Sequence, residues 1–186
     1  MTAKKNFRRD TLTSHLGRDP QKHAGLVNMP VYRGSTVLFD DVATYEGRDP
    51  DDYKVMRYGI YGTPTTFALE AAVAELEGGD KAVALPSGLA AITAALAAFT
   101  KAGDHILMVD TTYGPTRTFC KRRLAPYGVE VEYYDPLIGA DIAKLIRPNT
   151  TLVYCEAPGS LSFEMQDIPA IAAAARSEEH TSELQS

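Results

Sequence analysis

Three short segments of the chain carry residue types that could bind a small molecule. The stretch LPSG places Ser87 and Gly88 directly before a sequence typical of a helix. Free N–H groups at a helix start, together with the helix dipole, favour an anion such as phosphate, and glycine lets that anion approach closely. The Ser87 hydroxyl adds another donor. The same pattern also fits a serine that only caps the helix, so this segment alone leaves both interpretations open.

The other two segments carry side chains suited to the rest of a ligand. Tyr113 follows an apolar run, where its flat ring could stack on an aromatic ligand. Glu156 and Ser160 follow a second apolar run and could supply polar contacts. A packed edge tyrosine and an ordinary turn at 158–159 are the simpler alternatives. The sequence has neither the GxGxxG fingerprint of dinucleotide sites nor the Gly-Lys-Ser/Thr of P-loops.

The elements that must position these residues alternate between strand and helix from Thr65 onward. The pattern predicts strands at 81–86, 105–110, 129–135 and 151–158, and helices at 65–79, 88–103, 115–128, 139–146 and 167–177. Such alternation indicates an α/β fold with a mainly parallel sheet and helices on both faces. Ligands of such sheets bind beyond the carboxyl ends of the strands, so we expect the three segments to meet there.

Residues 1–61 lack sustained periodicity and are rich in turn residues and charge. A segment this irregular is long for a loop inside a compact domain. We therefore expect an extended N-terminal arm, with a short apolar segment at 37–39, that lies along another surface such as a partner subunit.

Composition narrows the class of protein. The 186 residues suffice for one domain or one domain with an arm, and the formal net charge of −5 argues against nucleic acid as a partner. Apolar runs fall short of the roughly 20 residues of a membrane span, and the N-terminus lacks the apolar centre of a secretory signal. Cys120 and Cys155 have no metal-type spacing. We expect a cytoplasmic protein with reduced thiols and no metal or membrane partner.

Taken together, the three loops and the arm resemble the pyridoxal-phosphate enzymes of cysteine and methionine metabolism. The segments that carry the resemblance, in the family's order, are RYGIYGTPT, ALEAAVAELEGG, LPSGLAAI, GDHILMVDTTYGPT and CEAPGSLSFEMQDIPAI. It runs from about Leu12 to Ala175 and implies a truncated large domain of a fold type I pyridoxal-phosphate transferase, preceded by the arm. Within the family, DPLIGADIAKLIRPNT and PGSLSFEMQD look most like the bacterial cystathionine β-lyases.

The resemblance assigns roles to particular residues. The backbone amides of Gly88 and Leu89 would hold the cofactor phosphate, Ser87 matches the phosphate-cup position, and Tyr113 would stack on the pyridine ring. Glu156 would line the pocket near the cofactor ring.

Two further residues would face the substrate. Ser160 would line the substrate side of the pocket, and Tyr58 would reach the phosphate and substrate of the neighbouring subunit, since the family's active sites lie at a dimer interface. Ile60 stands where many relatives carry arginine as a second phosphate contact, so either Arg57 or another cation compensates, or phosphate binding is weaker than usual.

By the same resemblance, the complete enzyme would be a homodimer or homotetramer that converts L-cystathionine and water to L-homocysteine, pyruvate and ammonia. A fragment of a cystathionine γ-synthase, cystathionine γ-lyase or methionine γ-lyase is one alternative, and a non-catalytic partial domain is another. The family's Schiff-base lysine lies beyond the last matching segment. No catalytic residue is therefore assigned, and we expect no turnover by this chain alone.

The segment RSEEHTSELQS departs from the Ala-rich pattern before it and is similar to a translated sequencing adapter. We therefore expect three parts, namely a dimer-contacting arm at 1–61, a partial cofactor-binding large domain at 62–175 and a non-native tail at 176–186.

Overall fold

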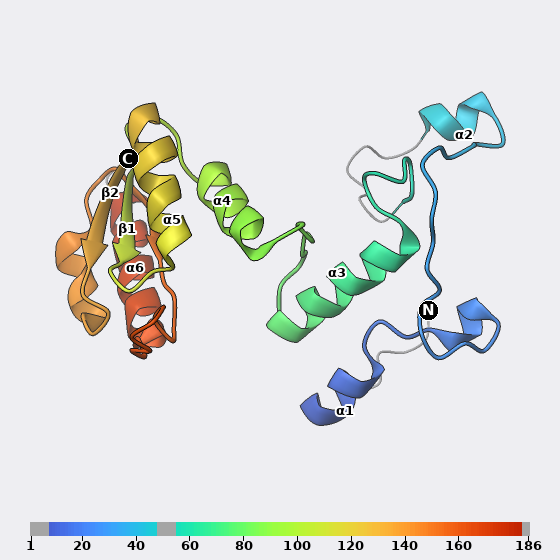
Figure 1. Cartoon of the computed structure of the whole chain (residues 1–186), viewed down its shortest axis with the longest axis horizontal. Coiled ribbons are helices and arrows are strands. Elements are labelled where there is room, and N and C mark those ends of the chain that lie inside the picture. Colours follow the sequence, from blue (N-terminus) through green and yellow to red (C-terminus); the bar gives the residue numbers. More distant parts are fainter. Residues whose placement is uncertain (1–7, 48–54, 184–186) are drawn as a thin grey trace. The chain divides into compact units, whose positions relative to one another are not determined.

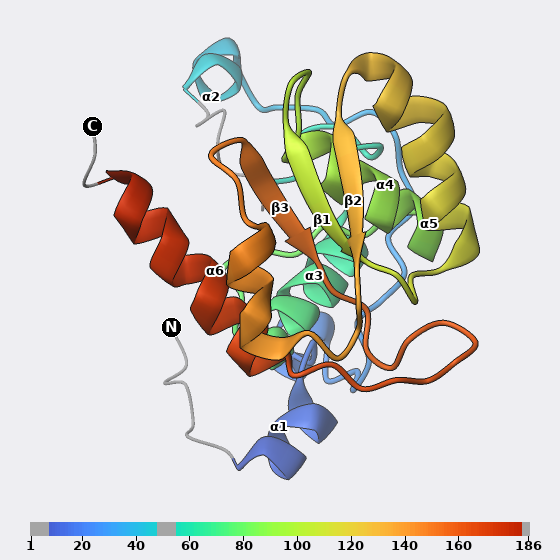
Figure 2. The same cartoon turned by 90° about the vertical axis from the view of Figure 1, so that its left-hand side faces the viewer.

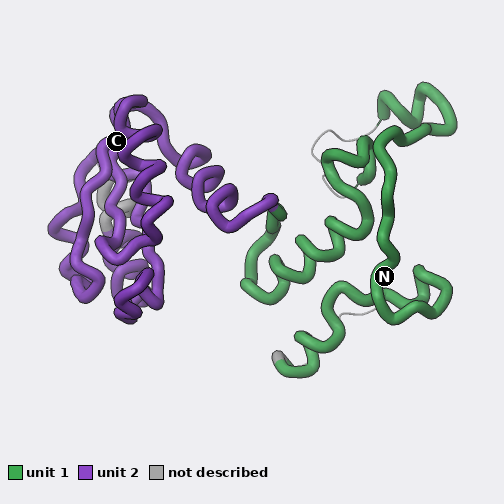
Figure 3. The backbone as a smooth tube through the Cα atoms, in the orientation of Figure 1, with its two compact units in different colours: residues 1–84 green, residues 85–186 purple. Residues whose placement is uncertain are grey.

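The computed structural model describes residues 8–47 and 55–183. The chain divides into two compact units, residues 1–84 and residues 85–186 (Figure 3). Each unit is described by itself below.

The first unit consists of short helices joined by irregular chain, followed by one long helix (Figure 1). Its helices are α1 (Arg9–His15), η1 (Pro20–His23), α2 (Val42–Glu46) and α3 (Pro64–Glu77). At the start of α3 the N–H of Thr63 donates to Thr66 Oγ1 at 2.8 Å. At its end Gly78 adopts the left-handed conformation with φ of 70°. The sequence prediction of this helix is confirmed.

A three-stranded parallel sheet forms the centre of the second unit (Figure 2). The strands are β1 (His105–Val109), β2 (Glu130–Tyr134) and β3 (Thr150–Tyr154), in the order β2-β1-β3. Every residue of the central strand β1 is buried. A strand covered on both faces requires a continuous apolar run, and the sequence HILMV is apolar after its first residue, His105.

Helices cover both faces of this sheet. They are α4 (Gly88–Ala98), α5 (Gly114–Phe119) with its continuation η2 (Cys120–Leu124) and η3 (Ala125–Tyr127), η4 (Gly139–Leu145) and α6 (Ile168–Glu183). On one face, Ile106 and Met108 pack with residues of α4 and η2. On the other face, Leu107 and Val109 pack with residues of η4 and α6. The alternation of side chains along β1 thus separates two cores.

Burial raises the pKa of the Cys120 thiol, on the first of these faces, to about 11. Its thiolate is therefore scarce at neutral pH, and Cys120 packs there as a small apolar side chain.

Two sequence predictions differ from the structure. Residues 81–86 were expected to form a strand, but they are irregular, so the sheet has three strands among the described residues instead of four. A strand exists only through its pairing, and residues 81–86 pair with none of the strands β1, β2 and β3. Residues Gly139–Leu145 form a 3₁₀-helix, where the sequence indicated an ordinary short helix.

The end of the chain bears on the expected division into parts. Helix α6 begins as predicted, with Asp167 Oδ1 accepting from the N–H of Ala170 at 3.0 Å. It continues to Glu183, beyond the predicted end at 177. The boundaries 1–61, 62–175 and 176–186 remain predictions.

Across the described parts of the chain, none of the helices combines the length and apolar character that crossing a membrane requires.

Leu107 offers a direct test of the sheet's central position. Its side chain is fully buried, whereas Leu137, in the turn after β2, is 72% exposed. We expect Leu107→Ala to lower the free energy of unfolding by about 2–5 kcal/mol, because it leaves a cavity between sheet and helices. The matched change Leu137→Ala should alter it by less than about 0.5 kcal/mol. Urea denaturation followed by circular dichroism measures both, and equal effects would contradict this arrangement of the core.

Candidate functional site

A pocket of about 570 Å³ lies in the second unit, between the start of α4 and the carboxyl ends of β1 and β3. It is lined by residues of the three segments singled out from the sequence and by two others: Ser87, Gly88, Leu89, Ile92, Tyr113, Tyr154 and Glu156. The expectation that the three segments meet at one edge of the sheet is therefore met in the structure.

The start of α4 offers free hydrogen-bond donors to this pocket. Ser87 caps the helix, because its Oγ accepts from the N–H of Ala90 at 3.1 Å. The first helical bond runs from the N–H of Ala91 to the carbonyl of Ser87 at 3.0 Å. The amides of Gly88 and Leu89 lie before that bond and have no acceptor within the helix. Capping by Ser87 is thus compatible with an anion site. Its side chain and carbonyl accept from the amides of Ala90 and Ala91, and the amides of Gly88 and Leu89 remain for the anion.

Space at Gly88 supports the same interpretation. A Cβ atom built on this glycine would meet no atom within 4 Å in the structure. Packing within the chain therefore does not require a glycine here. An anion that approaches the backbone closely would require one.

Glu156 joins the loop after β3 to the loop after β1. Its Oε2 atom accepts from Thr112 Oγ1 at 3.1 Å, from the N–H of Tyr113 at 3.1 Å and from the hydroxyl of Tyr154 at 3.4 Å. Three donors on one carboxylate oxygen fix both the carboxylate and the backbone that carries the Tyr113 ring. Glu156 was predicted to line the pocket, and in the structure it also holds the two loops together.

Tyr154 is a pocket residue that the sequence analysis missed. Burial, and after it the negative charge of Glu156, raise the pKa of Tyr154 above its usual value. The phenol therefore stays protonated at neutral pH and can donate its hydrogen bond to Glu156.

A signal for the missed residues was present in the sequence. Tyr154 lies two residues before Glu156, and side chains two apart on an extended segment point to the same side. Ile92 lies four residues after Gly88, one helical turn along the same face.

Two of the predicted site residues do not line this pocket. Ser160 follows Gly159 in the adjoining loop, where its N–H donates to the carbonyl of Thr111 at 2.8 Å. Tyr58 belongs to the first unit, where it forms an antiparallel bridge with Thr36 and an edge-to-face contact with Tyr61 at 5.7 Å between ring centroids. Their expected contacts with cofactor or substrate remain predictions.

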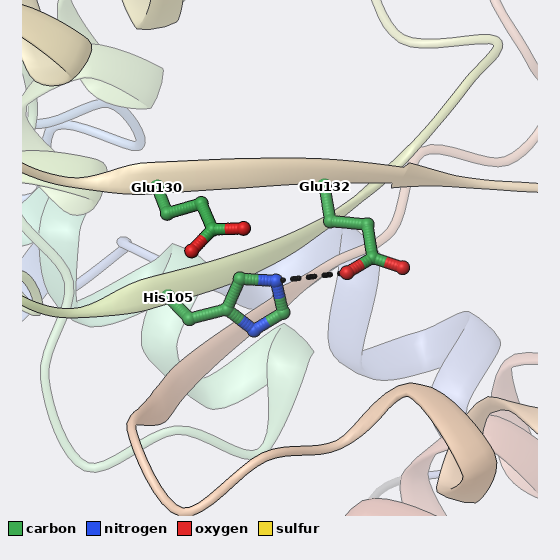
Figure 4. A group of neighbouring side chains, drawn as sticks. All are labelled: His105, Glu130 and Glu132. Atoms are coloured by element: carbon green, nitrogen blue, oxygen red, sulfur yellow. Dashed lines mark ion pairs between the residues drawn. The ribbon is translucent and has the colours of Figure 1, made fainter.

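The opposite edge of the sheet carries a second polar cluster, formed by His105 of β1 and by Glu130 and Glu132 of β2 (Figure 4). Figure 4 shows His105 Nε2 facing Glu132 Oε2, at 3.3 Å. These groups lie close enough to share a metal ion. However, the Arg147 guanidinium binds both carboxylates and lowers the pKa of Glu130 through its hydrogen bond. Arg147 already supplies the positive charge, so the cluster is an ion-paired network.

Comparison with known proteins gives one consistent family. A family model described as Cys/Met metabolism PLP-dependent enzyme matches residues 10–183. A Rhizobium johnstonii protein provisionally named a cystathionine beta-lyase is 52% identical over 166 residues, which make up 89% of this chain and 41% of that protein. Cystathionine beta-lyase MetC of Escherichia coli is 42% identical over 170 residues, 90% of this chain and 43% of its own length.

A solved structure gives the same picture. The crystal structure of metB from Corynebacterium glutamicum superposes with a TM-score of 0.80 at 29% identity, over 92% of this chain and 43% of the other. The chain thus spans about two fifths of the length of the curated relatives that it matches.

Gly159 provides a test of the close approach between the two loops. A Cβ atom at this buried position would lie 2.6 Å from Thr111 Oγ1, whereas a Cβ atom at Gly114 would meet nothing within 4 Å. We expect Gly159→Ala to push the loops apart and to lower the free energy of unfolding by about 1–3 kcal/mol. Gly114→Ala is the control and should cause no loss. Thermal unfolding of both variants measures this, and a neutral Gly159→Ala would show that the loops do not pack as described.

Proposed function

The chain belongs to the pyridoxal-phosphate-dependent enzymes of cysteine and methionine metabolism, and we propose that it forms the cofactor-phosphate and ring-binding part of a cystathionine β-lyase. This family assignment confirms the resemblance and the fold class predicted from the sequence. The identities of 52% and 42% to two proteins named as such lyases support the β-lyase among the family's reactions. The segment PGSLSFEMQD, which resembles the bacterial β-lyases, supports it as well.

The observation that carries the proposal is the pocket in which free amides and an aromatic ring meet. The amides of Gly88 and Leu89 at the start of α4 suit a phosphate dianion, because the helix dipole adds to their hydrogen bonds. The Tyr113 ring, whose backbone is held by Glu156, suits the face of a flat heteroaromatic ring. A phosphate group and an aromatic ring in one small molecule describe pyridoxal phosphate.

The chain's own residues would bind and orient this cofactor. Ser87 keeps its hydroxyl proton for the phosphate while its oxygen caps α4. Glu156 holds the ring platform through Oε2. When bound, pyridoxal phosphate supplies an electron sink for breaking bonds next to the substrate's α-carbon.

In the complete enzyme, the reaction would convert L-cystathionine and water to L-homocysteine, pyruvate and ammonia. We further propose that Ser160 makes a polar contact with the substrate. Tyr58 would act on the site of a second copy in a cytoplasmic homo-oligomer, which makes the arm part of the active site.

The residues that line the described pocket include no lysine. We therefore propose that this chain by itself holds pyridoxal phosphate non-covalently and has no lyase turnover.

Gly88 provides the test of the phosphate site. We expect Gly88→Asp to weaken binding of pyridoxal phosphate at least about tenfold, or about 1.4 kcal/mol, because it places a negative charge and bulk where the phosphate should lie. Gly79→Asp, after α3 in the first unit, makes the same change in charge at an exposed position and should leave binding intact. Equilibrium dialysis of the 186-residue chain measures both constants. Equal affinities for the two variants would overturn the phosphate assignment.

The products identify the reaction. We expect an enzyme that contains residues 1–175 within its full-length chain to release pyruvate and homocysteine in equal amounts from L-cystathionine. A γ-lyase would release cysteine and 2-oxobutyrate instead. Chromatographic identification of the keto acid decides between them, and 2-oxobutyrate as the main product would overturn the β-lyase proposal.

A further inference from the structure

A buried hydrogen-bonded path runs behind the pocket, from the end of β2 to the loop that carries Glu156. Tyr134, the last residue of β2, is 2% exposed, and Gln166, just before α6, is 7% exposed. The Tyr134 hydroxyl lies 2.9 Å from Gln166 Oε1, and Gln166 Nε2 donates to the backbone carbonyl of Glu156 at 2.7 Å. The side-chain amide of Gln166 thus joins the end of β2 to the loop after β3.

Hydrogen-bond chemistry fixes the direction of this path. A backbone carbonyl can only accept, so the nitrogen of Gln166 must face Glu156 and its oxygen must face Tyr134. An amide oxygen also only accepts, as does the backbone carbonyl of Tyr154, which lies 3.0 Å from the same hydroxyl, so the single proton of Tyr134 is shared between Gln166 Oε1 and that carbonyl. Burial raises the pKa of Tyr134, which keeps that proton in place. The carbonyl of Glu156 therefore fixes the orientation of the Gln166 amide, whose oxygen lies against the Tyr134 hydroxyl.

The path continues through Glu156 to the pocket. The carbonyl of Glu156 receives the Gln166 bond, and its carboxylate Oε2 receives the N–H of Tyr113. The backbone of Glu156 is thus held by Gln166, and its side chain is held by the loop after β1. A shift of the Glu156 backbone would move Oε2 away from the Tyr113 amide, to which it lies at 3.1 Å.

We propose that Gln166, held in place by the Tyr134 hydroxyl, is a positioning residue that fixes Glu156 and, through its carboxylate, the backbone that presents the Tyr113 ring to the pocket. Gln166 does not line the pocket, so its effect on a ligand is indirect. The effect on pyridoxal phosphate rests on the proposed function, whereas the effect on Tyr113 rests on the hydrogen bonds alone.

The experiment compares three variants of the 186-residue chain with the unchanged chain. Gln166→Met keeps the length of the side chain and removes both hydrogen bonds. Gln166→Glu keeps the shape, but its ionised form offers only acceptors and would repel the Glu156 carbonyl. The protonated form donates one O–H and accepts at the other oxygen, as glutamine does. Tyr134→Phe removes only the hydroxyl and tests the path if both changes at Gln166 prevent folding.

The direct readout is the protection of the Tyr113 amide against hydrogen exchange, measured by NMR. We expect Gln166→Met to lower the protection factor about fivefold or more at every pH, since the buried hydrogen bond that holds the Glu156 backbone is lost. Gln166→Glu should lower it similarly at about pH 9 and restore it at about pH 6, because burial raises the pKa of the new carboxyl group. Tyr134→Phe should lower it in the same direction.

The controls separate positioning from general loosening. Tyr134, Cys155 and Glu156 are the titratable groups beside residue 166, so the unchanged chain is measured at both pH values. The amides of Ile106 and Leu107 in β1 should keep their protection in all variants. A fall in β1 protection equal to that at Tyr113, an unchanged Tyr113 amide in Gln166→Met and Tyr134→Phe, or no pH-dependent recovery in Gln166→Glu would each overturn the proposal.

Binding of pyridoxal phosphate to the same variants gives the second readout. We expect Gln166→Met to weaken it about threefold or more, a smaller change than direct loss of a phosphate contact. If the unchanged chain fails to bind pyridoxal phosphate, the proposed function fails, and the Tyr113 amide still decides the part played by Gln166.

Discussion

The pocket depends on the convergence of three donors on a single oxygen atom, Oε2 of Glu156. The side chain of Glu156 comes from the loop after β3, and two of its donors come from the loop after β1. The parallel pairing of these strands makes the convergence possible, because Met108 of β1 lies opposite Tyr154 of β3 and both loops leave the sheet at the same edge. On folding, the Glu156 carboxylate loses hydrogen bonds to water and gains hydrogen bonds to these fixed donors. The free-energy cost is small, because the donors would otherwise be left without an acceptor.

The sheet presents different chemistry at its two ends. At the amino-terminal edge the charged groups pair with one another, since Arg147 binds both Glu130 and Glu132, and His105 contacts Glu132. At the carboxyl-terminal edge, free amides at the start of α4 and the exposed ring of Tyr113 remain open. Parallel strands place the loops after β1 and β3 at one edge, and the start of α4 lines the pocket with them. The edge with unsatisfied groups is the one suited to a ligand.

Much of the second unit could be predicted from local patterns. The apolar run of β1 predicted a strand, and Ser87 and Asp167 predicted the starts of α4 and α6, because capping needs only neighbouring residues. The strand expected at 81–86 was wrong for the opposite reason. Its pattern describes a segment that could pair, but a strand also needs a neighbouring strand beside it, and the local pattern does not contain that information.

The sequence by itself determined the family, the alternation of β1, β2 and β3 with the helices that follow them, and the residue types at Ser87–Leu89, Tyr113 and Glu156. Only the tertiary structure decided which atoms meet. It directed Glu156 Oε2 to the Tyr113 amide, 43 positions away, and joined Tyr134 to Gln166, 32 positions apart. The reason is physical: residue types and spacing fix what a side chain can donate or accept. Strand register and the packing of the loops fix the distance and angle at which it does so.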